Sequence, residues 1–95
     1  MYAAFRSFRH KGLRLFYEQG SLAEIQPKHS NRLRMQLAAL DTAHTHEDMD
    51  IPGFKLHELK DREKGQWSIW VNGNWLITFA FEDGNSCIAD YEDYH

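Results

Sequence analysis

The chain has 95 residues, a length that allows one domain and is too short for two separate hydrophobic cores. Hydrophobic residues make up 42% of it and charged residues 26%, which is typical of a folded globule and argues against disorder along the whole chain. The formal net charge at pH 7 is −3, so a site for a polyanion would have to be made from a few cations that the fold gathers. We therefore expect one domain over residues 1–95.

The cysteine count and the hydropathy pattern indicate in which cell compartment the protein is located. Cys87 is the only cysteine, so it has no partner for an internal disulfide, and we expect it to be a small buried core residue in a reducing environment. No apolar run approaches the roughly 20 residues that span a bilayer, and the N-terminal residues lack the apolar segment of a signal peptide. A cytoplasmic protein without a membrane partner is expected.

The first half of the chain has the hydrophobic period of α-helices. Leu13, Phe16 and Tyr17 lie at i, i+3 and i+4 and form one apolar stripe on a short helix that Gly20 can end. Before this helix, Phe5 and Phe8 give only a weak signal for a short strand. A second helix is predicted from Pro27 to about Ala43, because proline suits the first turn. Its apolar positions repeat at helical spacing: Leu33, Leu37 and Leu40.

A short turn of helix and then a run of strands are predicted next. Thr45 and Asp48 have the spacing of a capping box for one more helical turn, which Ile51-Pro52-Gly53 ends. Residues 54–59 form a plausible strand, and two more strands flank Asn72-Gly73. That pair predicts a type I′ hairpin turn, which needs positive φ at both central residues. Asp83-Gly84 marks another turn, before a last strand over residues 86–91.

Side-chain alternation gives the predicted sheet an aromatic face and an open face. Trp70, Leu76 and Ala80 stand on the open face. The aromatic face, which we expect the helices to cover, holds Trp67, Ile69, Val71, Trp75, Ile77, Phe79 and Phe81. The predicted fold is α+β, with two helices on one face of a mainly antiparallel sheet of four or five strands.

Two histidines and a lysine are candidates for RNA chemistry. His57 falls on the same face as Lys55 by strand alternation, and His95 is the last residue. RNA cleavage without a metal needs a base for the 2′-hydroxyl, a cation for the phosphate and an acid for the leaving 5′-oxygen. His57, His95 and Lys60 would supply these groups if the last strand brings the chain end beside the second strand. The alternative is that they are ordinary solvated side chains.

Several stretches resemble HigB-type toxins of the RelE/ParE superfamily: HKGLRLF, IPGFKLHELK, GQWSIWVNGNWLITFAFEDG and the terminal YEDYH. The resemblance covers nearly the whole chain, from about Phe5 to His95. It implies a ribosome-dependent endoribonuclease that cleaves mRNA in the A site of the 70S ribosome, without a metal or cofactor. It also implies a cognate helix-turn-helix antitoxin of the HigA type, through which the toxin would reach operator DNA. The catalytic positions that it implies are His57, Lys60, Asp93, Tyr94 and His95.

A role can be assigned to each of these positions as a hypothesis. One histidine takes the proton of the 2′-hydroxyl and the other protonates the leaving oxygen; the sequence does not say which does which. Lys60 neutralises the developing charge on the phosphate. Asp93 orients a histidine, and Tyr94 offers a face on which an unpaired base can stack. Without the resemblance, Asp93 and Tyr94 would be read as a solvated chain end.

One position departs from the family. HigB-type toxins commonly carry arginine where this chain has Leu76, and leucine cannot clamp a phosphate as a guanidinium does. Either other cations hold the RNA, or the activity is weakened. The side chains expected to line the RNA path are Lys55, Arg62, Lys64, Trp70 and Leu76.

Two other functions remain open at this point. The chain would be a catalytically silent homologue that still binds the antitoxin and helps repress the operon if Leu76 abolishes activity. A ParE-like inhibitor of DNA gyrase is the other alternative, although such contact inhibition needs no acid–base pair. No metal site is expected in the polar junction that holds His44, His46, Glu47, Asp48 and Asp50, because zinc sites favour fixed spacings on ordered elements.

Overall fold

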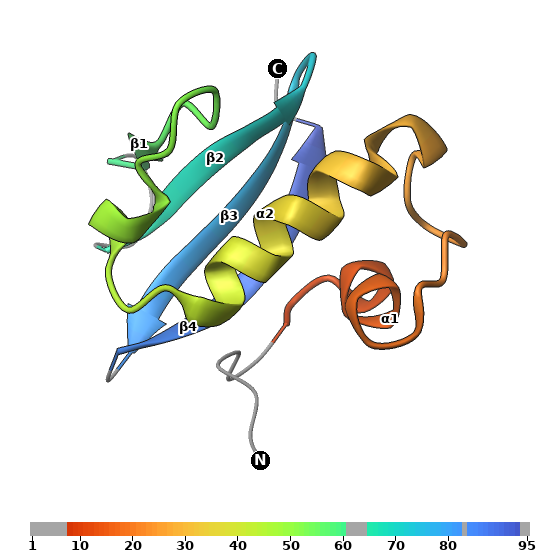
Figure 1. The fold of residues 1–95 in the computed structure, drawn as a ribbon, viewed down its shortest axis with the longest axis horizontal. Helices are drawn as coiled ribbons and strands as arrows, with labels where there is room; N and C mark the ends of the chain where they lie inside the picture. The colour runs from red at the N-terminus through yellow and green to blue at the C-terminus, as the bar shows by residue number, and fades with distance from the viewer. Residues whose placement is uncertain (1–7, 61–64, 83, 94–95) are drawn as a thin grey trace.

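The computed structural model of the chain describes residues 8–60, 65–82 and 84–93 (Figure 1). In chain order its elements are α1 (Lys11–Gln19), the 3₁₀ helix η1 (Pro27–His29), α2 (Ser30–Thr42), the 3₁₀ helix η2 (His46–Met49), β1 (His57–Glu58), β2 (Trp67–Asn72), β3 (Trp75–Glu82) and β4 (Asn85–Asp93). None of the helices in these ranges has the length and apolarity to span a membrane.

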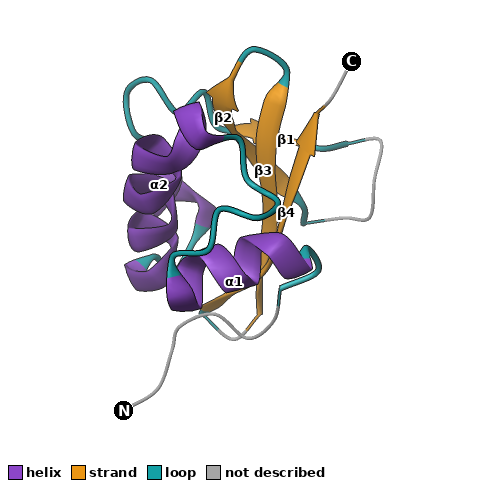
Figure 2. Ribbon diagram, turned by 90° about the vertical axis from the view of Figure 1, so that its right-hand side faces the viewer, coloured by secondary structure: helices purple, strands orange, loops and turns teal. Residues whose placement is uncertain are grey.

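The described strands form one sheet with two helices on one side. The strand order is β1-β2-β3-β4, and each neighbouring pair is antiparallel. Figure 2 shows α1 and α2 together as one layer and the four strands as the other. The predicted α+β fold is therefore confirmed.

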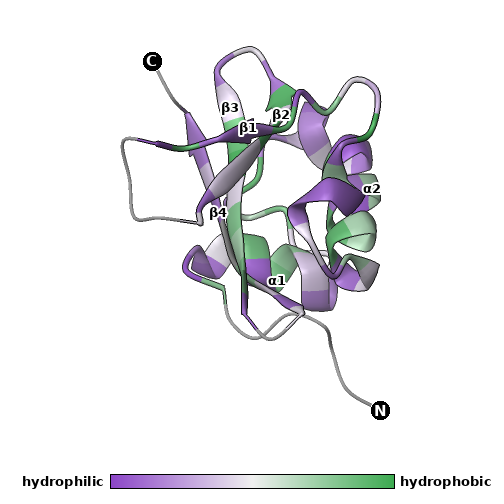
Figure 3. Ribbon diagram, turned by 90° about the vertical axis from the view of Figure 1, so that its left-hand side faces the viewer, coloured by the Kyte–Doolittle hydropathy of each residue, from purple (hydrophilic) through white to green (hydrophobic). Residues whose placement is uncertain are grey.

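The hydrophobic core lies between the two layers. From α2 it takes the predicted stripe of Leu33, Leu37 and Leu40, all of which are buried. The sheet contributes Ile69, Val71, Ile77, Phe79 and Tyr91, with Trp67, Trp75 and Phe81 packed against them. Figure 3 marks hydrophobic stretches on α2, β2 and β3. The aromatic face of the sheet is thus the covered one, as predicted, and Cys87 is buried as expected.

The ends of α1 agree with the sequence. His10 precedes the helix, and its Nδ1 accepts a hydrogen bond of 2.9 Å from the backbone N–H of Leu13. Gly20 ends the helix in the left-handed region, at φ 74°. Phe8 lies outside any strand and packs against Tyr17 with a ring-centroid distance of 5.7 Å, so the weak strand signal there was wrong for Phe8. Phe5 lies outside the described residues.

The second helix and the helical turn after it also begin close to the predicted residues. Pro27 starts η1, which runs directly into α2. The carboxylate of Asp48 accepts hydrogen bonds from the backbone N–H groups of His44 and Thr45 at 2.9 and 3.3 Å, which confirms the capping role of Asp48 in η2. These two bonds, that of His44 first, lower the pKa of Asp48, because they favour the ionised carboxylate.

The hairpin between β2 and β3 is present but is displaced from the predicted turn. Asn72 pairs with Trp75, so Gly73 and Asn74 are the two central residues. Of these only Gly73 has positive φ, at 57°, and the predicted type I′ turn centred on Asn72-Gly73 was wrong. The cause is a register shift between Trp70 and Asn72, which keeps Asn72 in the strand. Glycine in the first central position is instead the pattern of type II′ turns.

The predicted strand over residues 54–59 is reduced to His57 and Glu58. Lys55 interrupts it, because its φ of 52° lies in the left-handed region, which an extended strand does not use. Phe54 still accepts a backbone hydrogen bond of 2.7 Å from the N–H of Trp70. The next turn falls where it was predicted: Glu82 pairs with Asn85, and Gly84 has a φ of 79°. Asp83, its other residue, lies outside the described residues.

The burial of His29 was not anticipated from the sequence. His29 is only 1% exposed, and its Nδ1 lies 2.7 Å from the hydroxyl of Tyr91. The edge of the His29 ring also contacts Trp75, at a centroid distance of 5.7 Å. Through these contacts His29 joins the start of α2 to the two strands at the C-terminal edge of the sheet.

This burial predicts a loss of stability in acid. Burial, and then the positive charge of Lys28, lower the pKa of His29 in the folded state. The unfolded chain therefore binds the proton first, so the stability from neutral His29 is present above about pH 6.5 and falls below it. The free energy of unfolding in urea should drop more for the wild type than for His29→Gln between about pH 7.5 and about pH 5.5. Equal drops in the two proteins would contradict this role of His29.

Candidate active site

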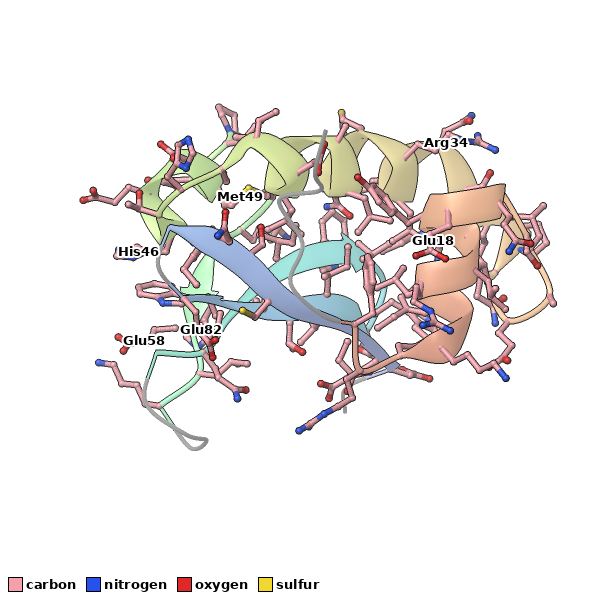
Figure 4. The ribbon with its side chains drawn as sticks, turned by 90° about the horizontal axis from the view of Figure 1, so that it is seen from below. Glu18, Arg34, His46, Met49, Glu58 and Glu82 are labelled. Atoms are coloured by element: carbon pink, nitrogen blue, oxygen red, sulfur yellow. The ribbon has the colours of Figure 1, made fainter. Side chains whose placement is uncertain are left out.

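A groove of about 570 Å³ lies on the open face of the sheet, away from the helices. We call it the open-face groove. Its lining residues come from the segment around β1 and from β2 and β3: Lys55, His57, Glu58, Leu59, Lys60, Ser68, Trp70 and Leu76. In Figure 4, Glu58 and Glu82 project from this side of the sheet, whereas Met49 lies on the side of the helices.

The floor of the open-face groove is largely apolar and comes from two paired strands. Trp70 of β2 and Leu76 of β3 are directly opposite each other, and both are half-buried. The indole N–H of Trp70 donates a hydrogen bond of 2.9 Å to the carbonyl of Gly73, which fixes the direction of the ring. Ser68 and Thr78 form the next cross-strand pair on this face of the sheet. Such a floor suits a flat, partly apolar group such as a nucleobase.

Basic side chains, together with Glu58, form one wall of the groove. Lys55, His57 and Lys60 are all exposed and all line it. The ammonium of Lys55 lies 4.2 Å from the centroid of the Trp70 ring, within the range of a cation–π contact. The sequence argument placed Lys55 beside His57 by strand alternation, and that reason was wrong because Lys55 is not in a strand. Its left-handed backbone nevertheless brings it to the same groove.

Two polar residues of α2 hold this wall against β2. The Nη2 of Arg32 donates to the carbonyls of Gly53 and Trp70 at 2.6 and 3.2 Å, and Gln36 donates to the same Trp70 carbonyl at 2.8 Å. The guanidinium also lies 5.5 Å from the ring of Phe54. Sequence reasoning missed both residues. The available signal was Gln36, a polar residue at the helical spacing of a buried stripe.

The opposite edge of the open face is acidic. Glu92 of β4 pairs with Leu76, and its carboxylate accepts a hydrogen bond of 3.3 Å from the hydroxyl of Thr78. Asp90, two pairs further along, is opposite Thr78. The open face therefore runs from the side of β1, where Lys55 and Lys60 outnumber Glu58, to carboxylates on β4. A phosphate is favoured on the β1 side, because like charges repel it on the other.

The predicted catalytic residues are only partly brought together. His57 and Lys60 line the groove, whereas Asp93 lies at the end of β4, opposite Trp75. Three strand spacings separate β1 from β4, roughly 14 Å across the sheet, so Asp93 is remote from His57. Of the predicted RNA-binding residues, Lys55, Trp70 and Leu76 line the groove. Four predicted residues lie outside the described ones: Arg62, Lys64, Tyr94 and His95.

The polar junction after α2 has structural contacts. The ring of His46 stacks on Trp67 with a centroid distance of 3.9 Å and an interplanar angle of 5° (Figure 4). The Nδ1 of His44 lies 3.1 Å from the carbonyl of Gly84, and Asp48 caps η2. Within the described part of the chain, no three of its histidine, cysteine, aspartate and glutamate residues are grouped as metal ligands would be.

The chain is similar to known toxins along almost all of its length. Residues 6–95 match a family model described as the RelE-like toxin of the type II toxin–antitoxin system HigB. Endoribonuclease HigB of Proteus vulgaris is 42% identical over 90 residues, which cover 95% of this chain and 98% of that protein. Toxin HigB-1 of Vibrio cholerae is 34% identical over 90 residues, which cover 93% of this chain and 94% of that protein.

Two helices over one face of an antiparallel sheet, with an open groove on the other, agree with the class of RelE-like toxins that the family model describes. Within that class, the chain belongs to the HigB family of toxins of type II toxin–antitoxin systems. The resemblance seen in its motifs is thereby confirmed.

Proposed function

We propose that this protein acts as a ribosome-dependent endoribonuclease that cleaves mRNA in the ribosomal A site. One observation carries the proposal: the open-face groove gathers the imidazole of His57, the ammonium groups of Lys55 and Lys60, and the indole of Trp70. These are the groups that proton transfer, phosphate neutralisation and base stacking require. The name of the Proteus vulgaris relative, an endoribonuclease, supports RNA as the substrate.

The proposed chemistry is a transfer of the phosphate within the RNA strand. The 2′-oxygen of a ribose attacks the adjacent phosphorus while the bond from phosphorus to the 5′-oxygen breaks. The products are a 2′,3′-cyclic phosphate and a free 5′-hydroxyl, with one proton removed from the 2′-hydroxyl and one delivered to the leaving oxygen. His57 and His95 are the proposed proton carriers, and Lys60 neutralises the charge that develops on the phosphate. These steps need neither a metal nor a cofactor.

The position of Asp93 sets a condition on this chemistry. His95 is two residues from Asp93, and an extended chain of that length reaches at most about 7 Å, which is less than the width of the sheet between β4 and β1. We therefore infer that the scissile phosphate lies between His57 and His95, above Leu76, so that the two imidazoles act from opposite sides. In this arrangement Asp93 orients His95, and Tyr94 stacks on a base.

The proposed partners follow from the family. A type II toxin is neutralised by an antitoxin, and we propose a cognate helix-turn-helix antitoxin of the HigA type. The toxin would meet operator DNA only through this antitoxin, and 70S ribosomes carrying mRNA would be its targets in the cytoplasm. The surplus of cations on the β1 side of the open-face groove supports an approach to RNA from that side.

Leu76 favours a second candidate function. It occupies the middle of the groove floor, between Trp70 and Glu92, where an arginine would reach a phosphate. Without that arginine, the protein would be a silent homologue that binds the antitoxin and acts in repression of the operon. Lys55 and Lys60 still line the groove, which argues against a complete loss of catalytic activity.

Mapping mRNA 5′ ends after induced expression without the antitoxin tests the two candidates. The first predicts new ends that carry a 5′-hydroxyl and that lie at a fixed position relative to the ribosomal A site. In a parallel reaction, the purified protein should cut an mRNA bound to 70S ribosomes much faster than the same mRNA free in solution, because the proposed cleavage needs the ribosome. Arrested growth without such ends would contradict the nuclease. Normal growth without such ends, together with tight antitoxin binding, would support the silent homologue.

A further inference from the structure

A second, smaller hollow lies at the sheet edge beside the start of α2. It has a volume of about 230 Å³, and we call it the α2-edge hollow. Figure 1 shows the start of α2 at the same end of the sheet as the hairpin between β2 and β3. Trp70 lines both this hollow and the open-face groove, so the two are neighbours. The lining residues are Lys28, His29, Arg32, Trp70, Val71 and Asn72.

The α2-edge hollow has the charge of an anion site. Its lining includes two cations, Lys28 and Arg32, and no acidic residue. Lys28 is exposed, and its side chain is available to a ligand from solvent. The hollow also lies at the N-terminal end of the continuous helix η1–α2, where the helix dipole favours negative charge.

Two buried nitrogen atoms of lining residues lack a hydrogen-bond partner. Among the described residues, neither Nε2 of His29 nor Nε of Arg32 has one. The hydroxyl of Tyr91 accepts from the backbone N–H of Gln26 at 3.3 Å and can donate its own proton to Nδ1 of His29. The neutral imidazole then carries its proton on Nε2. A buried acceptor, Oε1 of Gln36, also lacks a partner among the described residues. Buried polar groups are nearly always paired, so the side chains around the hollow keep hydrogen-bonding capacity that the described contacts do not use.

We propose that the α2-edge hollow binds a backbone phosphate of the single-stranded RNA that leaves the open-face groove past Trp70. The inference rests on the proposed RNA-cleaving function and extends its substrate contact beyond the scissile phosphate. Lys55 and Arg32 both lie near the Trp70 ring, at 4.2 and 5.2 Å from its centroid. Cations alternating with an aromatic ring are what single-strand binders use to follow a nucleic-acid backbone.

Oligoribonucleotides with 2′-O-methyl groups test this subsite, because the blocked 2′-oxygen prevents cleavage and leaves binding alone to be measured. A dinucleotide can fill the open-face groove, whereas a hexanucleotide reaches past Trp70. Lys28→Ala should weaken binding of the hexanucleotide and reduce the slope of log Kd against log salt by about 0.7, the value for one phosphate contact on a single strand. Dinucleotide binding should stay as in the wild type. Lys11→Ala removes an equally exposed lysine from α1, away from both hollows, and should change neither.

Three results would overturn the subsite. The first is an unchanged salt slope in Lys28→Ala, and the second is an equal loss with the dinucleotide. The third is a loss of antitoxin affinity with RNA binding intact, which would assign the hollow to the protein partner. Because the probes cannot be cut, a slope reduced only for the hexanucleotide would uphold the subsite even if the protein proved unable to cleave mRNA. Conversely, if the protein cleaves mRNA in the A site but Lys28→Ala has the wild-type salt slope, the subsite proposal is wrong and the proposed nuclease activity is unaffected.

Discussion

Replacing His57 by glutamine is expected to lower the rate of mRNA cleavage by about 10²–10⁴-fold, the usual contribution of a positioned general acid or base. His57 is exposed at the wall of the open-face groove, and its neighbours Lys55 and Lys60 lack an imidazole ring that could pass a proton between its two nitrogens. Glutamine keeps a polar side chain of similar reach but cannot exchange the proton. Single-turnover cleavage on ribosomes programmed with a defined mRNA measures this loss.

A matched histidine on another surface provides the control. His44→Gln removes an exposed imidazole that contacts the carbonyl of Gly84 and does not line the groove, and it should cleave at the wild-type rate. The urea midpoint and antitoxin affinity of His57→Gln should stay near those of the wild type. A wild-type cleavage rate in His57→Gln would show that His57 takes no part in proton transfer. A parallel loss of cleavage and stability would mean that His57 acts in folding.

Leu76→Arg is expected to raise the cleavage rate, by up to about 10²-fold, because removing one such electrostatic contact typically costs 10²–10³. The new guanidinium would start from the middle of the groove floor, beside Trp70, where the proposed scissile phosphate lies. Glu92 is the cross-strand neighbour of Leu76 and would compete for the same charge. Combining Leu76→Arg with Glu92→Gln should therefore increase the rate further than Leu76→Arg alone.

The effect of charge has to be separated from that of shape. Leu76→Met keeps the apolar volume of the side chain and should cleave like the wild type. Steady-state cleavage of one mRNA by the four proteins, with the ribosome concentration held constant, makes the comparison. If neither arginine-containing variant exceeds the wild type, the missing arginine does not limit the activity, and the argument from Leu76 for a silent homologue loses its support.

The elements set by local signals were predicted well. α1 ends at Gly20, η1 begins at Pro27 and Asp48 caps η2, because caps and breakers act within a few residues of themselves. Alternation along β2 and β3 also separated the covered face from the open one, and it placed Trp70 and Leu76 together in the groove. These patterns need no knowledge of the rest of the chain.

Features that depend on distant contacts were not predicted. Arg32 and His29 look like ordinary helix residues in the sequence, yet their partners are the carbonyl of Gly53 and the hydroxyl of Tyr91. The bulge that moves the hairpin turn by one residue arises from strand pairing. His57, Lys60 and His95 were candidates from the chemistry of RNA cleavage alone, whereas Asp93 and Tyr94 came from the resemblance to HigB-type toxins. The groove brings two of them together, His57 and Lys60.

The backbone conformation of Lys55 is strained, and this strain affects which residues are favourable at position 55. Among the described residues it is the one non-glycine residue with positive φ, a conformation that disfavours any side chain with a Cβ by roughly 1–2 kcal/mol. Glycine adopts this conformation without strain, so the substitution Lys55→Gly is expected to stabilise the fold. It would also delete the ammonium that lies against Trp70. Folding and the proposed contact with RNA therefore make opposite demands on this single position.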